Sequence, residues 1–84
     1  MMENSIHTPQ QLGLVLRGRR KSLKLSQAAA AKTVGLLPKT VSGLETTPER
    51  SSVDSLFKLL SALELELVLR PKSFAGGKAG KSKW

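Results

Sequence analysis

The stretch from residue 26 to residue 45 constrains the fold more than any other part of this chain. Ser26 has the side chain of a helix N-cap, and Gly35 suits the left-handed residue that ends a short helix. Pro38 then opens a second helix, because proline fits the first helical position. Ala31 is small enough for two helices to cross closely, and a shared apolar core is offered by Val34, Leu36, Val41 and Leu44. This spacing predicts a helix-turn-helix, with an ordinary αα-hairpin inside a helical bundle as the alternative.

Two further helices flank this motif. A first helix starts at Thr8, where Gln11 can close a capping box, and it carries cations toward its C-terminal end. A last helix starts after Ser51 or Ser52, with Asp54 placed to complete a capping box from Ser51, and it has a wide apolar face. The two middle helices are expected to cover residues 27–34 and 38 to about 45.

The spacing of apolar residues changes after the last helix. Residues 64–70 alternate with a period of two, which is typical of a β-strand. No second strand is expected, so the backbone groups of this one would pair with another copy across a two-fold axis. An axis at Val68, which we favour, places Glu66 opposite Arg70 of the other copy, and an axis at Leu67 is the alternative. The expected dimer interface consists of Leu65, Glu66, Leu67, Val68, Leu69 and Arg70.

The composition favours such a dimer. A chain of 84 residues buries only a small core, and the absence of cysteine excludes disulfides and thiolate metal sites as a supplement. No apolar run approaches the roughly 18 residues that cross a bilayer, and no secretory segment follows Met1. We therefore expect a cytoplasmic homodimer without membrane association. Its parts would be a loose arm (1–7), a folded domain (8–70) and a disordered basic tail (71–84).

The chain is strongly basic, with 14 lysines and arginines against six acidic residues and a net charge of +8. One cluster lies toward the end of the first helix and another in the tail: Arg17, Arg19, Arg20, Lys21 and Lys24, and Arg70, Lys72, Lys78, Lys81 and Lys83. Such charge suits nucleic acid, an anionic membrane or an acidic partner, or it marks only a solvated face. The predicted helix-turn-helix favours double-stranded DNA among these.

The motif residues resemble those of a known family. Ser26-Gln27, Ala31, Gly35 and Thr40-Val41-Ser42 followed by Glu45 are similar to the phage-repressor helix-turn-helix family, also called XRE or Cro/CI-like, over about residues 8–63. More narrowly, the chain resembles the HipB-type antitoxins. That resemblance rests on the opening Met1-Met2, Thr8-Pro9 with Leu12, Phe57-Lys58-Leu59-Leu60, Leu63-Glu64-Leu65-Glu66 and the terminal Trp84.

The resemblance implies a fold and a function. The fold is mainly α, a compact domain of four to five helices with one C-terminal strand that pairs across a homodimer. The function is that of a repressor that binds an inverted-repeat operator, autoregulates its operon and holds a HipA-like serine/threonine kinase toxin. The alternatives are a stand-alone phage-type repressor without a toxin, and a protein-binding adaptor whose helix-turn-helix no longer reads DNA.

The resemblance also assigns candidate DNA contacts by position. Gln27 falls where the family contacts phosphate at the start of a helix, and Lys39 falls where a side chain can donate to guanine in the major groove. Leu37 or Pro38 can touch a thymine methyl, although Leu37 stands where the family usually has a polar residue. Arg20, from the basic cluster, is expected to reach the phosphate backbone. The full set is Arg20, Ser26, Gln27, Ala28, Leu37, Pro38, Lys39, Thr40 and Ser42.

Little in the sequence indicates an enzyme. His7 is the only histidine and lies in the expected arm without an evident partner, so we expect no catalytic residue, metal ligand or cofactor. Trp84, at the end of a polar tail, is either an incidental terminus or an anchor that docks in a pocket of the toxin.

Overall fold

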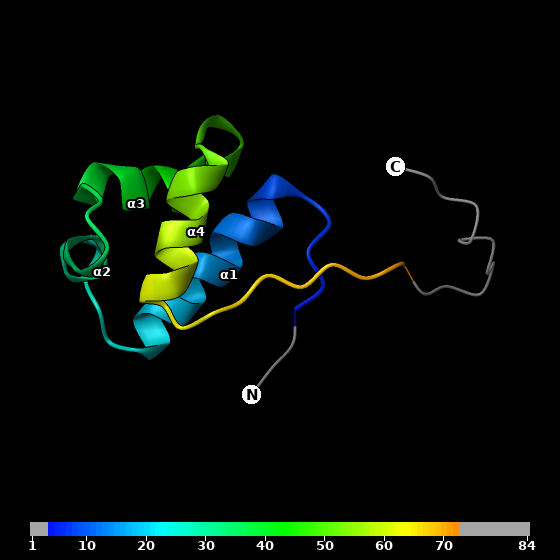
Figure 1. The fold of residues 1–84 in the computed structure, drawn as a ribbon, viewed down its shortest axis with the longest axis horizontal. Helices are drawn as coiled ribbons and strands as arrows, with labels where there is room; N and C mark the ends of the chain where they lie inside the picture. Colours follow the sequence, from blue (N-terminus) through cyan, green and yellow to red (C-terminus); the bar gives the residue numbers. More distant parts are fainter. Residues whose placement is uncertain (1–3, 73–84) are drawn as a thin grey trace.

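The computed structural model describes residues 4–72, which form four α-helices and one short 3-10 helix (Figure 1). In chain order these are α1 (Pro9–Ser22), α2 (Gln27–Thr33), α3 (Pro38–Thr46), η1 (Pro48–Arg50) and α4 (Val53–Ala62). α3 packs against α1 and α2, and α2 also contacts α4. α2 and α3 lie at one end of the molecule, and the segment that follows α4 runs to the other end (Figure 1). The mainly helical architecture expected from the sequence is confirmed.

Hydroxyl side chains begin the first two helices. Thr8 Oγ1 accepts a hydrogen bond from the backbone N–H of Gln11 at 3.1 Å, and Ser26 Oγ accepts one from the N–H of Ala29 at 2.9 Å. Both caps satisfy a backbone donor that has no partner within the helix. The Gln11 side chain reaches back as expected, but it accepts from the backbone N–H of His7, one residue before the cap.

α4 begins one residue later than the expected capping box requires. Ser52 is its N-cap, and the Ser52 hydroxyl accepts from the Ser55 N–H at 3.0 Å. The predicted capping box between Ser51 and Asp54 is therefore wrong. Asp54 instead forms an exposed ion pair with Lys58, one turn along the helix, at 3.2 Å.

Three helices end in the same way, with a left-handed residue followed by a hydrogen bond that closes the last turn. The left-handed residues are Lys24 (φ 60°), Gly35 (φ 71°) and Glu64 (φ 57°). In each case the next N–H donates to a carbonyl five positions earlier: Leu25 to Arg20, Leu36 to Ala31 and Leu65 to Leu60. Gly35 confirms the prediction. The predicted start of the strand at residue 64 is wrong. Glu64 is left-handed and cannot begin a strand, so an extended segment can start only at Leu65.

The core is small and lies where the helices meet. Its buried apolar residues are Leu16, Ala30, Ala31, Val41, Leu44, Leu59, Leu60 and Leu63. Ala31 is buried between the two helices of the motif as expected, whereas Val34 and Leu36 are only half-buried. Gly13 allows α1 to approach α3 closely, since a Cβ there would collide with the backbone carbonyl of Glu45.

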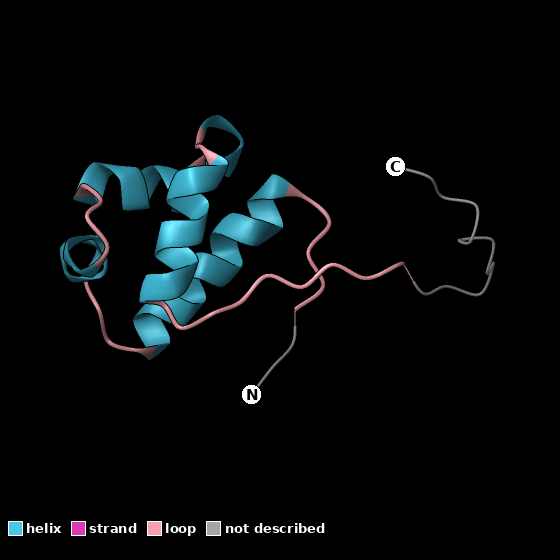
Figure 2. Cartoon of the chain, viewed as in Figure 1, coloured by secondary structure: helices cyan, strands magenta, loops and turns pink. Residues whose placement is uncertain are grey.

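The segment after α4 is extended and exposed. Residues 65–72 run along one side of a groove of about 1090 Å³, whose other wall includes residues 4–7 and the α1 residue Leu12. Leu67, Val68 and Leu69 are 49%, 63% and 85% exposed. No strand is assigned anywhere within residues 4–72 (Figure 2). Because the predicted pairing needs a second chain, the strand and its dimer contacts remain predictions.

Candidate nucleic-acid interface

The N-terminal end of α3 stands clear of the core. Leu37 is the N-cap of α3, makes no side-chain capping bond and is 64% exposed. Pro38 and Lys39 follow it and are also exposed, whereas Thr40 and Ser42 are half-buried. The expected DNA contacts at this end therefore divide into three exposed side chains and two half-buried ones. The half-buried site of Thr40 fits a packing or phosphate residue better than a base contact.

The N-terminal end of α2 holds three more of the expected contacts. Ser26 is exposed, but its hydroxyl is engaged as the helix cap. Ala28 is exposed and offers only a methyl group. Gln27 is half-buried, and its side-chain Nε2 donates to Glu45 Oε1 at 3.2 Å. Glu45 therefore restricts the orientation of the Gln27 amide.

Glu45 also accepts from the cation that the sequence assigned to phosphate. Arg20 Nε lies 2.6 Å from Glu45 Oε2, and Arg20 Nη2 lies 3.0 Å from Glu45 Oε1, so the pair is bidentate. Arg20 Nη1 donates to the Leu25 carbonyl at 2.8 Å. The Arg20 side chain is 10% exposed and that of Glu45 is 2% exposed. The Arg20 guanidinium thus joins α1 to α3 inside the domain, and its expected contact with a phosphate stays a prediction.

The ionisation of this pair follows from its contacts. Burial by itself raises the pKa of Glu45, but hydrogen bonds from Arg20 and Gln27, together with the charges of Arg20 and Arg17, outweigh burial and lower it. The hydrogen bond to Glu45 raises the pKa of Arg20 against the opposing effect of burial. Both groups are therefore charged at neutral pH, and Arg17 lies close enough for its charge to act on Glu45.

Glu45 is the structurally important residue that reasoning from chemistry did not assign a role. It is the only acidic residue between residues 4 and 48, in a region rich in lysine and arginine. It also closes the motif on which the family resemblance rests. A single acidic residue near the end of α3, among many cations, was therefore the feature of the sequence that could have indicated a buried ion pair.

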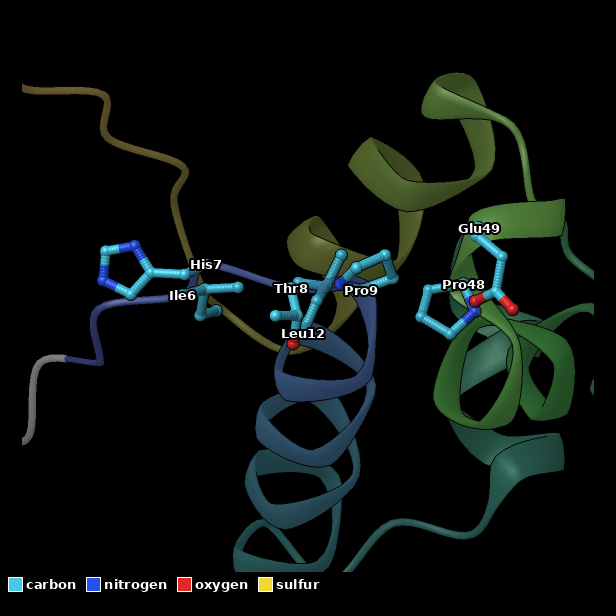
Figure 3. Close-up of a pocket in the computed structure, with 7 residues that line it drawn as sticks. All are labelled: Ile6, His7, Thr8, Pro9, Leu12, Pro48 and Glu49. Carbon is cyan, nitrogen blue, oxygen red and sulfur yellow. The ribbon is translucent and has the colours of Figure 1, made fainter.

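A second depression lies between α1 and η1, away from the N-terminal end of α3. It has a volume of about 340 Å³ and is lined by Ile6, His7, Thr8, Pro9, Leu12, Pro48 and Glu49 (Figure 3). The His7 ring and the Glu49 carboxylate lie at opposite ends of it, so they do not form an acid–base pair (Figure 3). Within residues 4–72, no three His, Asp or Glu side chains gather as metal ligands, and no helix has the length and apolar character to cross a membrane.

Comparisons with known proteins agree with this geometry. Residues 16–69 match the family described as helix-turn-helix. The chain is 32% identical to antitoxin HipB of Escherichia coli O6:H1 over 69 residues, which cover 82% of this chain and 73% of that protein. It is 30% identical to antitoxin HipB of Escherichia coli strain K12, again over 69 residues, which cover 82% of this chain and 78% of the relative.

Solved structures of HipB share the fold. A HipB variant in complex with an O2 20mer has a TM-score of 0.82 and 29% identity, covering 86% of this chain and 100% of its own. HipB in a HipA–HipB–O2–O3 complex has a TM-score of 0.81 and 28% identity, and the match covers 84% of this chain and 100% of the HipB chain. HipB in complex with an O4 20mer gives the same values. The chain belongs to the HipB-type antitoxins of the XRE helix-turn-helix family.

Proposed function

We propose that this protein is a dimeric, sequence-specific repressor that binds operator DNA and is the antitoxin of a HipBA-type operon. The observation that carries the proposal is the N-terminal end of α3, where Leu37, Pro38 and Lys39 project from a helix-turn-helix. Solved structures of HipB support it, because two are complexes with 20mers and another also holds HipA.

The exposed end of α3 is suited to the major groove. Lys39 can donate to the O6 and N7 acceptors of guanine, and Leu37 or Pro38 can contact a thymine methyl group. No acidic residue occurs between residues 4 and 44, so nothing in α1, α2 or the start of α3 repels phosphate. Direct base reading is therefore assigned to Lys39, with an apolar contact beside it.

Residues around this end position the protein on the DNA backbone. Gln27 has its amide fixed by Glu45, and its second Nε2 hydrogen remains for a phosphate oxygen. Thr40 and Ser42 carry hydroxyls at the border between core and solvent, and Ser26 and Ala28 lie at the start of α2. These contacts set the register of α3 without reading sequence.

Dimerisation uses the extended segment after α4. An isolated strand leaves its N–H and C=O groups without a ladder, and Leu67, Val68 and Leu69 expose apolar surface that a second copy would cover. Antiparallel pairing of residues 65–70 with the same residues of a second copy would complete the backbone ladder and cover the apolar surface. Two helix-turn-helix motifs related in this way read an inverted repeat with half-sites about 34–36 Å apart.

The toxin partner is a HipA-like serine/threonine kinase. Trp84, expected as the anchor for this partner, lies outside the described residues. The chain itself is assigned no catalytic step, in keeping with its helix-turn-helix antitoxin relatives. The proposed function places the protein in the cytoplasm, on the nucleoid.

The proposal is tested by binding. Duplexes recovered from a randomised library by in vitro selection with the full-length protein should contain an inverted repeat, and at physiological salt they should bind at least about a thousandfold more tightly than random duplex. The kinase-like product of the neighbouring gene should co-purify with the protein. Equal affinity for selected and random duplex would overturn the repressor. Selective DNA binding without a kinase partner would leave a stand-alone repressor.

A further inference from the structure

Arg19, next to the buried Arg20 on α1, reaches the C-terminal end of α4. Its Nε donates to the backbone carbonyl of Leu63 at 2.9 Å, across a separation of 44 residues in sequence. Its Nη2 lies 3.9 Å from Glu64 Oε1. A cation that donates to the last carbonyls of a helix satisfies an acceptor without an intrahelical partner and opposes the negative end of the helix dipole.

The point that Arg19 contacts is the place where the chain changes direction. Leu63 is fully buried, and Glu64 adopts a left-handed conformation that is strained for a residue other than glycine. The Leu65 N–H then closes the turn on the Leu60 carbonyl at 2.9 Å. Residues beyond Leu65 are exposed, so the direction of the extended segment depends on the conformation of residues 63–65.

Two consecutive arginines of α1 thus contact the two regions to which the proposed function assigns DNA recognition and dimerisation. Arg20 binds Glu45 near the end of α3, and Arg19 binds the exit of α4. In Figure 1 the C-terminal ends of α1 and α4 lie near each other, and the extended segment leaves from there. One helix, α1, therefore contacts both the end of α3 and the point where residues 65–70 leave α4.

We propose that Arg19 is a positioning residue for operator recognition: it fixes the direction of residues 65–70 relative to α3 and thereby the spacing of half-sites that the dimer accepts. This inference rests on the proposed function, because it requires residues 65–70 to pair across the dimer. With Arg19 removed, the strained turn at Glu64 loses its one side-chain hydrogen bond from α1 and is held by its backbone bonds and by the packing of Leu63 and Leu65. The two recognition helices then sample a wider range of separations.

The experiment compares Arg19→Ala with Lys21→Ala in the full chain. Lys21 is exposed on the same helix turn, so its replacement removes the same charge without touching α4. Both variants and the wild type are titrated against a selected operator duplex and against duplexes with one base pair inserted or removed between the half-sites. One base pair rotates a half-site by about 34° and shifts it along the axis.

The wild type and Lys21→Ala should bind the altered duplexes more weakly than the selected operator, and by the same factor. Arg19→Ala should reduce that factor by about three- to tenfold, the range expected for loss of one partly exposed charge-assisted hydrogen bond. Circular dichroism checks folding. Arg19→Met, which keeps the apolar stem of the side chain, replaces Arg19→Ala in the same titrations if the alanine variant is unfolded.

A purely structural role for Arg19 would lower thermal stability but leave the ratio between selected and altered duplexes unchanged, and that result would overturn the inference. Failure of the proposed function is distinct from this. In that case the wild type itself would be monomeric or would bind all spacings equally, whatever residue stands at position 19.

Discussion

The helix-turn-helix and the segment after α4 differ in what holds their structure. α2 and α3 have a cap, a glycine turn, a buried apolar core and a bidentate ion pair to α1, all within one chain. Residues 65–72 have an anchored start at Leu65 and then exposed apolar side chains. In the proposed function, each protomer alone forms the recognition surface, whereas the dimer surface needs a second copy. Substitutions in the two regions should therefore have different effects on stability, dimerisation and DNA binding.

The largest effect is expected at the dimer segment. Leu67→Lys places a charge where we expect an apolar contact across the two-fold axis, so the variant should be monomeric and should lose operator binding, because one helix-turn-helix makes half the contacts. Sedimentation measures the first effect and gel-shift titration the second. Ser61→Lys, at an exposed position of α4, is the matched control. A Leu67→Lys protein that remained dimeric would place the interface elsewhere.

The next largest effect is expected inside the domain. Arg20→Ala leaves the Glu45 carboxylate buried without its partner, which should lower the free energy of unfolding by about 3–5 kcal/mol. Denaturant titration at one fixed protein concentration measures this, since dimer stability depends on concentration. Lys32→Ala, at an exposed position of α2, should change stability by less than about 0.5 kcal/mol. If Arg20→Ala had normal stability but weakened DNA binding, Arg20 would contact phosphate, as the sequence predicts, and the ion pair would contribute little to stability.

Acid should weaken the same pair. The pKa of Glu45 in the folded chain is lower than in the unfolded chain. Its contribution is therefore complete above its unfolded pKa of about 4.3 and is lost as the pH falls through the lower folded value. Unfolding measured between neutral pH and acid should show a decline that is shallower in Glu45→Gln. Glu49→Gln, at an exposed site, should follow the wild type. Identical slopes in all three proteins would contradict the ion pair.

A smaller and more selective effect is expected at the recognition surface. Lys39→Ala should cost about 1–3 kcal/mol of discrimination at one base pair in each half-site, because a donor to guanine is removed. Stability and dimerisation should not change, since Lys39 is exposed and belongs to α3, whereas the segment after α4 runs to the other end of the molecule in Figure 1. Titration against operators substituted one base pair at a time locates the effect. Equal weakening on every sequence would show that Lys39 contacts phosphate.

Local sequence signals predicted the elements well. Thr8 and Ser26 cap the helices that they were expected to cap, and Gly35 adopts the left-handed conformation. These features depend on residues within four positions of one another, and the chemistry of each residue limits the choices. Where two neighbouring serines offered the same cap, the sequence left the choice open, and the structure has Ser52 as the cap.

Features that depend on distant residues were not predicted. Arg20 was one cation in a cluster of five, and only the close approach of α1 to α3 at Gly13 brings it to Glu45. The strand was expected from residue 64 because periodicity ignores backbone conformation, whereas the end of α4 places Glu64 in the left-handed region. The pairing of residues 65–70, which the alternating pattern does predict, involves a second chain and stays a prediction.

The smallest predicted effect concerns the turn after α1, which has the same left-handed geometry as the exit of α4 but no role in dimerisation. Lys24 has φ 60°, so Lys24→Gly should relieve steric strain and raise stability by about 0.5–1 kcal/mol despite the greater entropy of glycine in the unfolded chain. For a domain of this size the midpoint of thermal unfolding should rise by roughly 2–8 °C. Lys21→Gly, in the last turn of α1, should instead lose up to about 1 kcal/mol, because glycine is unfavourable at a helical position. If Lys24→Gly were destabilising to the same extent as Lys21→Gly, residue 24 would not be left-handed in solution, and α1 would end differently from α4.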